Sequence, residues 1–299
     1  MINENFKTGY VAIVGEPNTG KSTLLNSILG VHLSIVSKKP QTTRKNVMGI
    51  YSNDEAQIIF TDTPGVLSPA YLLQEKMLGY IEHALGDTDV VLLMLDMLSP
   101  DFERLAETAL GGITKLGKPV ILVLNKVDAL DDRNVTLPVI EKYNNMKIFK
   151  EIVPISALKN DNVELLTKLI IENLPIGEIL YDPEQVSDQP QRFFVSELIR
   201  EQAFKMFKKE LPYSVEIEII KFQESNGKDK TRITADIIVE RESQKGIVIG
   251  KGGSMLKLLG TNARLSIEEF LGEKIYLELF VKVKEGWRSN ESRLKGFGY

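Results

Sequence analysis

The stretch GEPNTGKS at residues 15–22 constrains the fold of this 299-residue chain more than any other feature. It fits the pattern G-x-x-x-x-G-K-[ST], follows the apolar run YVAIVG (10–15) and precedes the helix-like stretch KSTLLNSILG (21–30). A glycine-rich phosphate loop between a strand and a helix is the setting that the P-loop requires. The sequence therefore predicts an α/β domain in which this unit belongs to a sheet covered by helices.

Further apolar runs extend this prediction along the first part of the chain. Two of them, DVVLLMLD and PVILVLNK, are nearly continuous, as expected for strands that are covered on both faces. Helical spacing separates these runs, so the alternation predicts a mostly parallel sheet flanked by helices. The predicted strands after the P-loop are 56–62, 89–96, 119–126 and 151–157, and the predicted helices are 71–86, 101–117 and 161–173.

The pattern changes after PIGEILYDPEQVSDQP (175–190), whose proline, aspartate, serine and glutamine content is typical of a linker. We expect a nucleotide-binding domain at 1–176, a linker at 177–190 and a second, α+β domain at 191–299. That domain has the order α-β-β-α-α-β. Its predicted elements are a helix at 193–212 ended by proline, strands at 213–220 and 231–240, a short helix, a helix at 254–270 and a strand at 274–284.

Composition excludes several kinds of chemistry. The chain has no cysteine, so it can form neither disulfides nor a thiolate nucleophile. Its two histidines, His32 and His83, lie far apart in the sequence, which disfavours a zinc site or a histidine-based triad. The N-terminus lacks the pattern of a signal peptide, and no apolar run approaches the roughly 20 residues that span a bilayer. We expect a cytosolic protein.

Charge is distributed unevenly between the two parts. Residues 1–190 contain 17 Lys+Arg and 25 Asp+Glu, whereas residues 191–299 contain 20 and 16. A basic second part suggests a nucleic-acid partner. A solvated surface explains the same excess equally well.

The P-loop residues carry a defined chemistry. Gly15 and Gly20 permit a turn whose backbone N–H groups surround phosphate oxygens. Lys21 can reach the β- and γ-phosphates, and Ser22 offers a hydroxyl to Mg²⁺. In DTPG, Asp62 can hold the same ion through water.

Other segments complete a nucleotide switch. Gly65 of DTPG lets a backbone N–H approach the γ-phosphate. In QTTR, either Thr42 or Thr43 can close on Mg²⁺ while the γ-phosphate is present, although the segment also reads as a flexible loop. Val66 stands where many small GTPases carry a water-orienting glutamine, so we expect slow intrinsic hydrolysis.

The sequence NKVD (125–128), directly after a buried strand, selects the base. An ionised Asp128 only accepts hydrogen bonds, and guanine offers it two donors on one edge whereas adenine does not. Asn125 would connect the loops, the Lys126 stem would cover the purine, and the loop after the next strand would complete the pocket. The candidate nucleotide-binding residues are Gly15, Asn18, Gly20, Lys21, Ser22, Thr23, Asp62, Gly65, Asn125, Lys126, Asp128, Ser156 and Ala157. The candidate catalytic residues are Lys21, Thr42, Thr43 and Gly65, and the candidate Mg²⁺ ligands are Ser22, Thr42, Thr43 and Asp62.

A second glycine loop, GKGG at 250–253, lies between two helical stretches of the second domain. In this element order it indicates a KH domain of the bacterial type, whose GxxG loop holds a single-stranded RNA backbone of about four nucleotides. A structural turn with solvated lysines fits the same residues. We expect Ile247, Val248 and Ile249 to line the groove, and Trp287 either to stack on bases or to pack on the domain. The candidate RNA-binding residues are Lys245, Ile249, Gly250, Lys251, Gly252, Gly253 and Lys257.

Taken together, GEPNTGKSTLLN, QTTR, DTPG, NKVD and VERESQKGIVIGKGG resemble the Era family of bacterial GTPases over essentially the whole chain. The resemblance implies a GTP-hydrolysing, Mg²⁺-dependent switch that binds 16S ribosomal RNA near its 3′ end and assists assembly of the 30S subunit precursor. It also implies peripheral contact with the inner face of the cytoplasmic membrane, K⁺ held by Asn18, and a monomer. Thr19 departs from the valine that the family usually carries, which affects only the expected nucleotide affinity.

Three alternatives share parts of these motifs. An RNA-binding module with a slow nucleotide sensor would show no RNA-dependent hydrolysis. An ATP-dependent kinase leaves NKVD and GKGG without a role. A tRNA-modifying relative would need a cofactor domain and a C-terminal thiol that this chain lacks.

Overall fold

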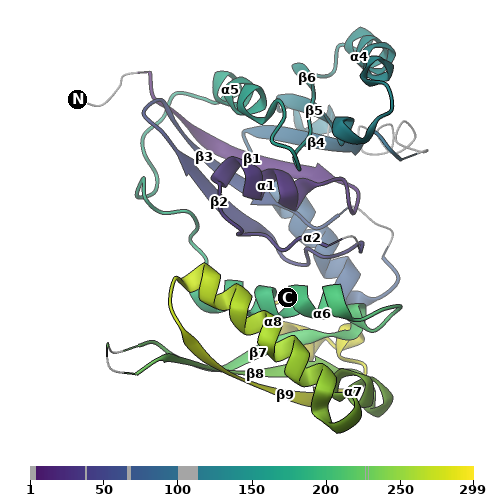
Figure 1. Ribbon diagram of the computed structural model, residues 1–299. Helices are drawn as coiled ribbons and strands as arrows, with labels where there is room; N and C mark the ends of the chain where they lie inside the picture. Colours follow the sequence, from purple (N-terminus) through teal and green to yellow (C-terminus); the bar gives the residue numbers. More distant parts are fainter. Residues whose placement is uncertain (1–4, 38, 66–68, 100–113, 226, 228) are drawn as a thin grey trace. The chain divides into compact units, whose positions relative to one another are not determined.

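The computed structural model describes residues 5–37, 39–65, 69–99, 114–225, 227 and 229–299, which fall into two compact units (Figure 1). The first unit comprises residues 1–34, 43–68 and 77–188. The second unit comprises residues 35–42, 69–76 and 189–299. The short segments 35–42 and 69–76 come from the N-terminal part of the chain but group with the C-terminal part, which the sequence did not predict.

The first unit is built on a six-stranded sheet with the order β2-β3-β1-β4-β5-β6. All neighbouring strands are parallel except β2 and β3, so the predicted mostly parallel sheet is confirmed. The strands are β1 (Lys7–Gly15), β2 (Val47–Ser52), β3 (Ala56–Asp62), β4 (Val90–Asp96), β5 (Val120–Asn125) and β6 (Glu151–Pro154).

Strand β2 is the one that the sequence analysis missed. It pairs antiparallel with β3 across a short connection, at the edge of the sheet. Gly49 lies in its middle, where an added Cβ would come within 2.7 Å of the Leu29 side chain. This glycine interrupts the apolar pattern of the strand because a helix packs closely over it.

Helices cover both faces of the sheet. The first unit contains α1 (Lys21–Leu29), the C-terminal part of α2 (Leu72–Gly86), α4 (Thr136–Asn145) and α5 (Val163–Asn173). Alternate residues of β1, such as Ala12 and Val14, pack in a core with Ile81 of α2 and Tyr143 of α4. Strands β4 and β5 are buried along almost their whole length, as their continuous apolar character predicts. The predicted helix at 101–117 lies mostly outside the described residues, which resume with the 3₁₀ turn Thr114–Leu116.

The segment after α5 is held along the first unit. The buried side chain of Gln57 accepts hydrogen bonds from the backbone N–H groups of Leu180 (2.8 Å) and Tyr181 (2.9 Å) and donates to the Tyr181 carbonyl (2.8 Å). Further along, Ile50 of the edge strand β2 donates its N–H to the Val186 carbonyl (2.9 Å). The segment expected to be a linker therefore covers the outer edge of the sheet as far as residue 188.

The second unit contains a three-stranded sheet, β7-β8-β9, whose first pair is antiparallel and whose second pair is parallel. The predicted order α-β-β-α-α-β is confirmed. Its elements are α6 (Gln191–Met206), β7 (Glu216–Gln223), β8 (Thr231–Val239), α7 (Glu242–Ile249), α8 (Ser254–Leu271), β9 (Ile275–Val283) and a terminal α9 (Glu291–Gly296).

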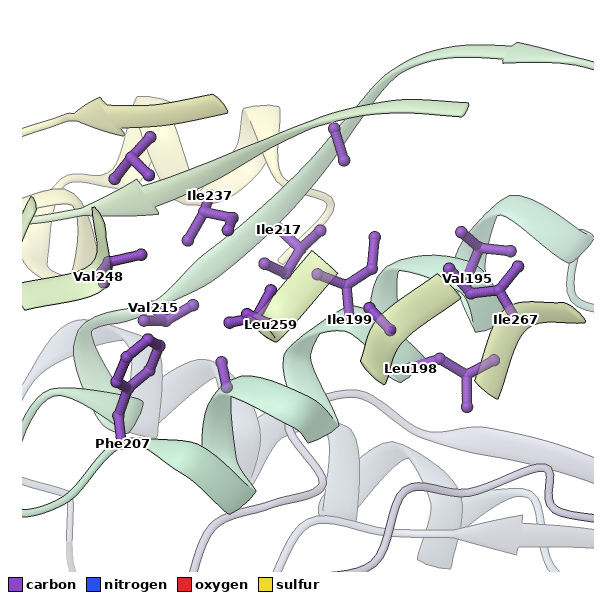
Figure 2. Close-up of a cluster of buried hydrophobic side chains, with 14 of the residues drawn as sticks. Val195, Leu198, Ile199, Phe207, Val215, Ile217, Ile237, Val248, Leu259 and Ile267 are labelled. Atoms are coloured by element: carbon purple, nitrogen blue, oxygen red, sulfur yellow. The ribbon is translucent and has the colours of Figure 1, made fainter. Parts of the chain in front are cut away.

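Helices α6 and α8 pack on one face of this sheet. Alternate residues of β8, including Ile233 and Ile237, point into the core that receives Leu198 of α6 and Leu259 of α8 (Figure 2). The prediction that the first helix runs to Pro212 was wrong, because α6 ends at Met206. Phe207 caps the helix in an extended conformation and inserts its ring into the core.

The single tryptophan belongs to the second unit. Trp287 is fully buried, donates its indole N–H to the Ser214 carbonyl (3.0 Å) and packs edge-on against Phe297. Of the two alternatives for this residue, packing on the domain is therefore correct. None of the described helices is long and apolar enough to cross a bilayer.

Candidate nucleotide and RNA sites

The P-loop connects β1 to α1 through backbone conformations that favour glycine. Gly20 has φ 101°, and an added Cβ would lie 2.2 Å from the Asn125 side-chain nitrogen. At Gly15, a Cβ would lie 2.5 Å from the Met94 carbonyl oxygen. Both positions exclude a side chain, because they bring the loop against the neighbouring strands β4 and β5.

Lys21 curls back over this loop. Its ammonium donates to the carbonyls of Gly15 (3.0 Å) and Glu16 (2.8 Å), and the residue is only 5% exposed. Burial lowers the pKa of Lys21 to about 8, although Asp62 and Glu16 act in the opposite direction. The site therefore places a poorly solvated cation where phosphate oxygens would replace backbone carbonyls as its partners.

Three oxygen-bearing side chains meet beside Lys21. The Ser22 hydroxyl donates to Asp62 (2.6 Å) and lies 2.9 Å from the Thr43 hydroxyl. The second carboxylate oxygen of Asp62, Oδ1, is buried and has no hydrogen-bond partner among the described residues. Hydroxyl and carboxylate oxygens are ligands that Mg²⁺ prefers, so this cluster fits that ion.

The two threonines of QTTR differ in position. Thr43 reaches the cluster, whereas the Thr42 hydroxyl donates to the Lys39 carbonyl (2.8 Å).

Burial raises the pKa of Asp62 above its usual range, with Lys21 and the Ser22 hydrogen bond opposing it. A bound cation would reverse this effect by favouring the ionised carboxylate.

Asn125 connects three loops at the carboxyl edge of the sheet. Its amide nitrogen donates to the Thr19 carbonyl (2.7 Å), and its side-chain oxygen accepts from the Ala157 N–H (3.0 Å). The adjacent Ser156 is fully buried and lies on the same loop as Ala157. Asp128 lies half-buried in the following 3₁₀ turn, Val127–Ala129. Two of the candidate base-binding residues, Asn125 and Ala157, are thus hydrogen-bonded to each other, and Asn125 connects them to the P-loop.

Asp96 is a further candidate residue of the nucleotide site, which the sequence motifs did not indicate. It ends β4 directly beside Asn125 in the sheet register, and its carboxylate accepts from the Lys126 ammonium at 2.5 Å. This ion pair orients the Lys126 side chain. In the sequence, Asp96 could have been recognised as a carboxylate that ends the apolar run DVVLLMLD, whose strand pairs with the strand that precedes NKVD.

The remaining nucleotide candidates border the same loop. Asn18 has φ 66°, a conformation rare for residues with a side chain, and Thr23 lies half-buried in the first turn of α1. A Cβ at Gly65 would lie 2.5 Å from the Pro17 nitrogen, so the DTPG backbone packs directly on the P-loop. Val66, at which we expect the water-orienting group to be missing, lies outside the described residues.

In the second unit, the GKGG turn joins α7 to α8. Gly250, Gly252 and Gly253 all have positive φ, of 71°, 58° and 79°. Lys251 and Lys257 are exposed, and an added Cβ on Gly252 or Gly253 would meet no described atom within 4 Å. The turn therefore presents bare backbone and Lys251 to solvent, and Lys257 is exposed on the first turns of α8.

The side chains beside the turn divide between surface and core. Ile247 is 57% exposed and Ile249 is partly buried, but Val248 is fully buried in the core of the unit. The expectation that Val248 lines a groove was therefore wrong, because helical periodicity turns it inward. Lys245 lies 3.9 Å from Glu242 and remains partly exposed.

Comparison with known proteins supplies the decisive observation. Residues 10–126 match a family model described as 50S ribosome-binding GTPase, and residues 210–288 match a KH domain model. A crystal structure of an Era variant from Aquifex aeolicus bound to GDP and AlF₄⁻ is 41% identical, with a TM-score of 0.94, over 98% of this chain and 99% of the other. The chain belongs to the Era family.

Membership in the Era family accounts for both units at once. A second Era structure, in complex with MgGDPNP and nucleotides 1506–1542 of 16S ribosomal RNA, has the same identity, coverage and TM-score. The predicted fold, a P-loop GTPase domain followed by a KH domain, is confirmed. The kinase alternative, which gave GKGG no role, does not account for the KH domain.

Proposed function

We propose that this Era-family chain is a GTP hydrolase that binds 16S ribosomal RNA near its 3′ end and assists small-subunit assembly. The observation that carries this proposal is the likeness, over 98% of the chain, to Era structures that hold a guanine nucleotide or both a nucleotide and that RNA. The exposed GKGG turn and the network around Asn125 support it from this chain's own residues.

Different residues of the nucleotide site bind the base, the phosphates and Mg²⁺. Asp128 accepts the two guanine donors, while Lys126, oriented by Asp96, covers the purine. Lys21 exchanges its backbone carbonyl partners for β- and γ-phosphate oxygens, and the Gly65 backbone faces the γ-phosphate. Ser22, Asp62 and Thr43 would hold Mg²⁺, which would neutralise charge on the phosphate oxygens. Of the two threonine candidates, the hydrogen bond to Ser22 favours Thr43.

Base selection is tested by the change Asp128→Asn. The asparagine amide can accept from ring N1–H but cannot accept from the exocyclic amino group of guanine, and its own N–H instead matches the carbonyl that xanthine carries there. We expect GTP affinity to fall by about 100-fold or more while XTP binding improves. The exposed neighbour Asp131, changed to asparagine, is the control. Equal affinity of the unmodified protein for GTP and ATP would refute guanine selection.

RNA binding is tested at the GKGG turn with Gly253→Asp. The Cβ position is open, but the positive φ of Gly253 (79°) strains the backbone of any residue placed there, so the control must carry the same strain. A carboxylate at this position repels the phosphates that the turn would hold. Gly272→Asp is a matched control, because Gly272 also has positive φ (69°), has no described atom near its Cβ position and caps the other end of α8. We expect at least a tenfold loss of affinity for a 16S 3′-end oligonucleotide in the first variant and none in the second. Equal binding by both would remove GKGG from the RNA site.

Finer features of the proposal rest on the family resemblance. They are K⁺ held beside the phosphates by Asn18, a monomeric state, a cytoplasmic location, peripheral contact with the inner membrane face and action on the 30S precursor. Hydrolysis rates measured in K⁺ against Na⁺, with and without ribosomal RNA, test the first of these and separate an RNA-coupled enzyme from a slow sensor.

A further inference from the structure

Arg200 is a fully buried arginine in the middle of α6, a helix of the KH unit. Its guanidinium binds the Glu197 carboxylate through both Nε (2.9 Å) and Nη2, and its Nη1 donates to the Thr42 carbonyl at 2.7 Å. A core of apolar side chains alone would pack this unit at lower cost, because a buried charge is expensive unless it is fully paired. Here the charge is paired with Glu197, and the guanidinium also donates to a backbone oxygen from the N-terminal part of the chain.

The segment that Arg200 binds leads directly into the Mg²⁺ cluster. Residues 35–42 group with the KH unit, and the chain enters the nucleotide unit at the Thr42–Thr43 peptide bond. Thr42 therefore receives its hydrogen bond from α6, while the next residue, Thr43, lies 2.9 Å from Ser22. One peptide bond separates the contact made by Arg200 from the hydroxyl that the proposed function assigns to Mg²⁺.

Two further contacts hold the same segment on α6. The buried Glu201 carboxylate accepts from the Val36 N–H at 2.9 Å, and the Lys39 ammonium donates to the Phe204 carbonyl. Gln41, between them and Thr42, has φ 58°, a backbone conformation that persists in a non-glycine residue only where its surroundings hold it. Helix α6 thus binds segment 35–42 at three points along its length.

We propose that Arg200 is a positioning residue for GTP hydrolysis, which fixes the Thr42 carbonyl and thereby the Thr43 hydroxyl at the Mg²⁺ site. This inference rests on the proposed function. None of the sequence motifs indicates this role for a residue of α6. The base and the α- and β-phosphates bind elsewhere, so Arg200 acts on the GTP-bound state and leaves GDP affinity unchanged.

The test is Arg200→Lys in the full chain. A lysine can bind Glu197 or Thr42, but its compact ammonium lacks the planar fork with which the guanidinium reaches both partners. We expect kcat for GTP to fall about tenfold, in line with the loss of one hydrogen bond from a charged donor. The Mg²⁺ concentration for half-maximal rate should rise several-fold, and the Kd for GDP should stay within about twofold. A purely structural role would not separate GDP binding from Mg²⁺ dependence.

Arg192→Lys is the matched control. Arg192 lies on the same helix and also donates to a backbone carbonyl, that of Ile219 (2.9 Å), but it does not contact residues 35–42 in the described structure. We expect wild-type hydrolysis and Mg²⁺ dependence from this variant. A tenfold loss here as well would attribute the effect to general loosening of α6 and overturn the inference.

A second variant, Glu197→Gln, covers the case in which Arg200→Lys fails to fold. The glutamine keeps the shape and one acceptor but loses the charge and the second acceptor, so the guanidinium is held less firmly. We expect a loss of about threefold in kcat in the same direction. Wild-type hydrolysis in every foldable Arg200 and Glu197 variant, or GDP binding weakened as much as hydrolysis, would overturn the inference. Absence of GTP hydrolysis by the wild type would instead overturn the proposed function, and the inference with it.

Discussion

At the scale of single residues, the nucleotide site contains a buried lysine whose pKa is lowered. The sequence predicts that Lys21 meets phosphates, but only the fold reveals that the ammonium is 5% exposed and that its pKa is lowered to about 8. Phosphates bind the charged form, so nucleotide binding must be coupled to protonation of this group. The direction follows from linkage: the charged fraction of the free protein falls as pH rises through 8.

We therefore predict that GDP affinity depends on pH between 7 and 9. The GDP affinity should be nearly constant below pH 8. Above pH 8 it should weaken, and the loss should approach about tenfold for each further pH unit. Lys21→Arg provides the comparison, because arginine stays charged over this range and should give weaker but pH-independent binding. Titration calorimetry at half-unit pH steps measures the GDP affinity of the wild type and of Lys21→Arg. Identical slopes for the two proteins would contradict a titrating Lys21.

At the scale of elements, one buried glutamine makes several of the contacts that hold the segment 177–188 on the first unit. Gln57 of β3 binds the backbone of residues 180 and 181 through three hydrogen bonds and also donates to Ser52. Composition alone suggested a loose linker here. Proline, aspartate and serine disfavour regular structure, but they do not prevent a segment from binding side chains of the adjacent sheet edge.

We predict that Gln57→Ala releases this segment. The free energy of unfolding of the first unit should fall by about 2 kcal/mol, because backbone groups lose their partners and a buried side chain is truncated. Limited proteolysis should cut between residues 178 and 188 in the variant and not in the wild type. Ser52→Ala removes one partner of Gln57 and leaves its contacts with the segment, so this control should stay resistant. Resistance of Gln57→Ala would show that other contacts suffice.

At the scale of the whole molecule, the chain contains a single tryptophan. Trp287 is buried in the second unit, so its fluorescence reports on that unit alone. The same unit contains Glu268, which accepts hydrogen bonds from Lys274 (2.7 Å), Arg264 (2.8 Å) and the Ile275 N–H (3.4 Å). These contacts, led by that of Lys274, lower the pKa of Glu268 from 4.5 to about 2.

This shift predicts acid sensitivity of the KH unit. A carboxyl whose folded pKa is depressed stabilises the fold above its unfolded pKa, and that contribution is lost as pH falls from 4.5 through about 2. The urea midpoint of the Trp287 transition should therefore drop over this window in the wild type. The urea midpoint of Glu268→Gln should be lower than that of the wild type at pH 7 and should change less below pH 4.5. Parallel midpoints of the two proteins across the window would exclude Glu268 as the source.

The sequence by itself determined much of this protein. Local patterns set the P-loop between β1 and α1, the buried strands β4 and β5, and the KH order around GKGG, because hydrophobic period and glycine placement act over a few residues. Two local predictions failed. Gly49 weakened the alternating apolar pattern of β2, so this strand was missed, and α6 ends at Met206, with Phe207 as its cap, rather than at Pro212.

Only the tertiary structure decided which distant residues meet. It brought Asp96 to Lys126, connected Asn125 to Thr19 and Ala157, placed Thr43 rather than Thr42 at the Ser22–Asp62 cluster, and buried Trp287. It also paired Arg200 of α6 with the Thr42 carbonyl. Contacts between residues that are separated by whole helices and strands depend on strand order and on how those elements pack. No local pattern in the sequence determines either of these.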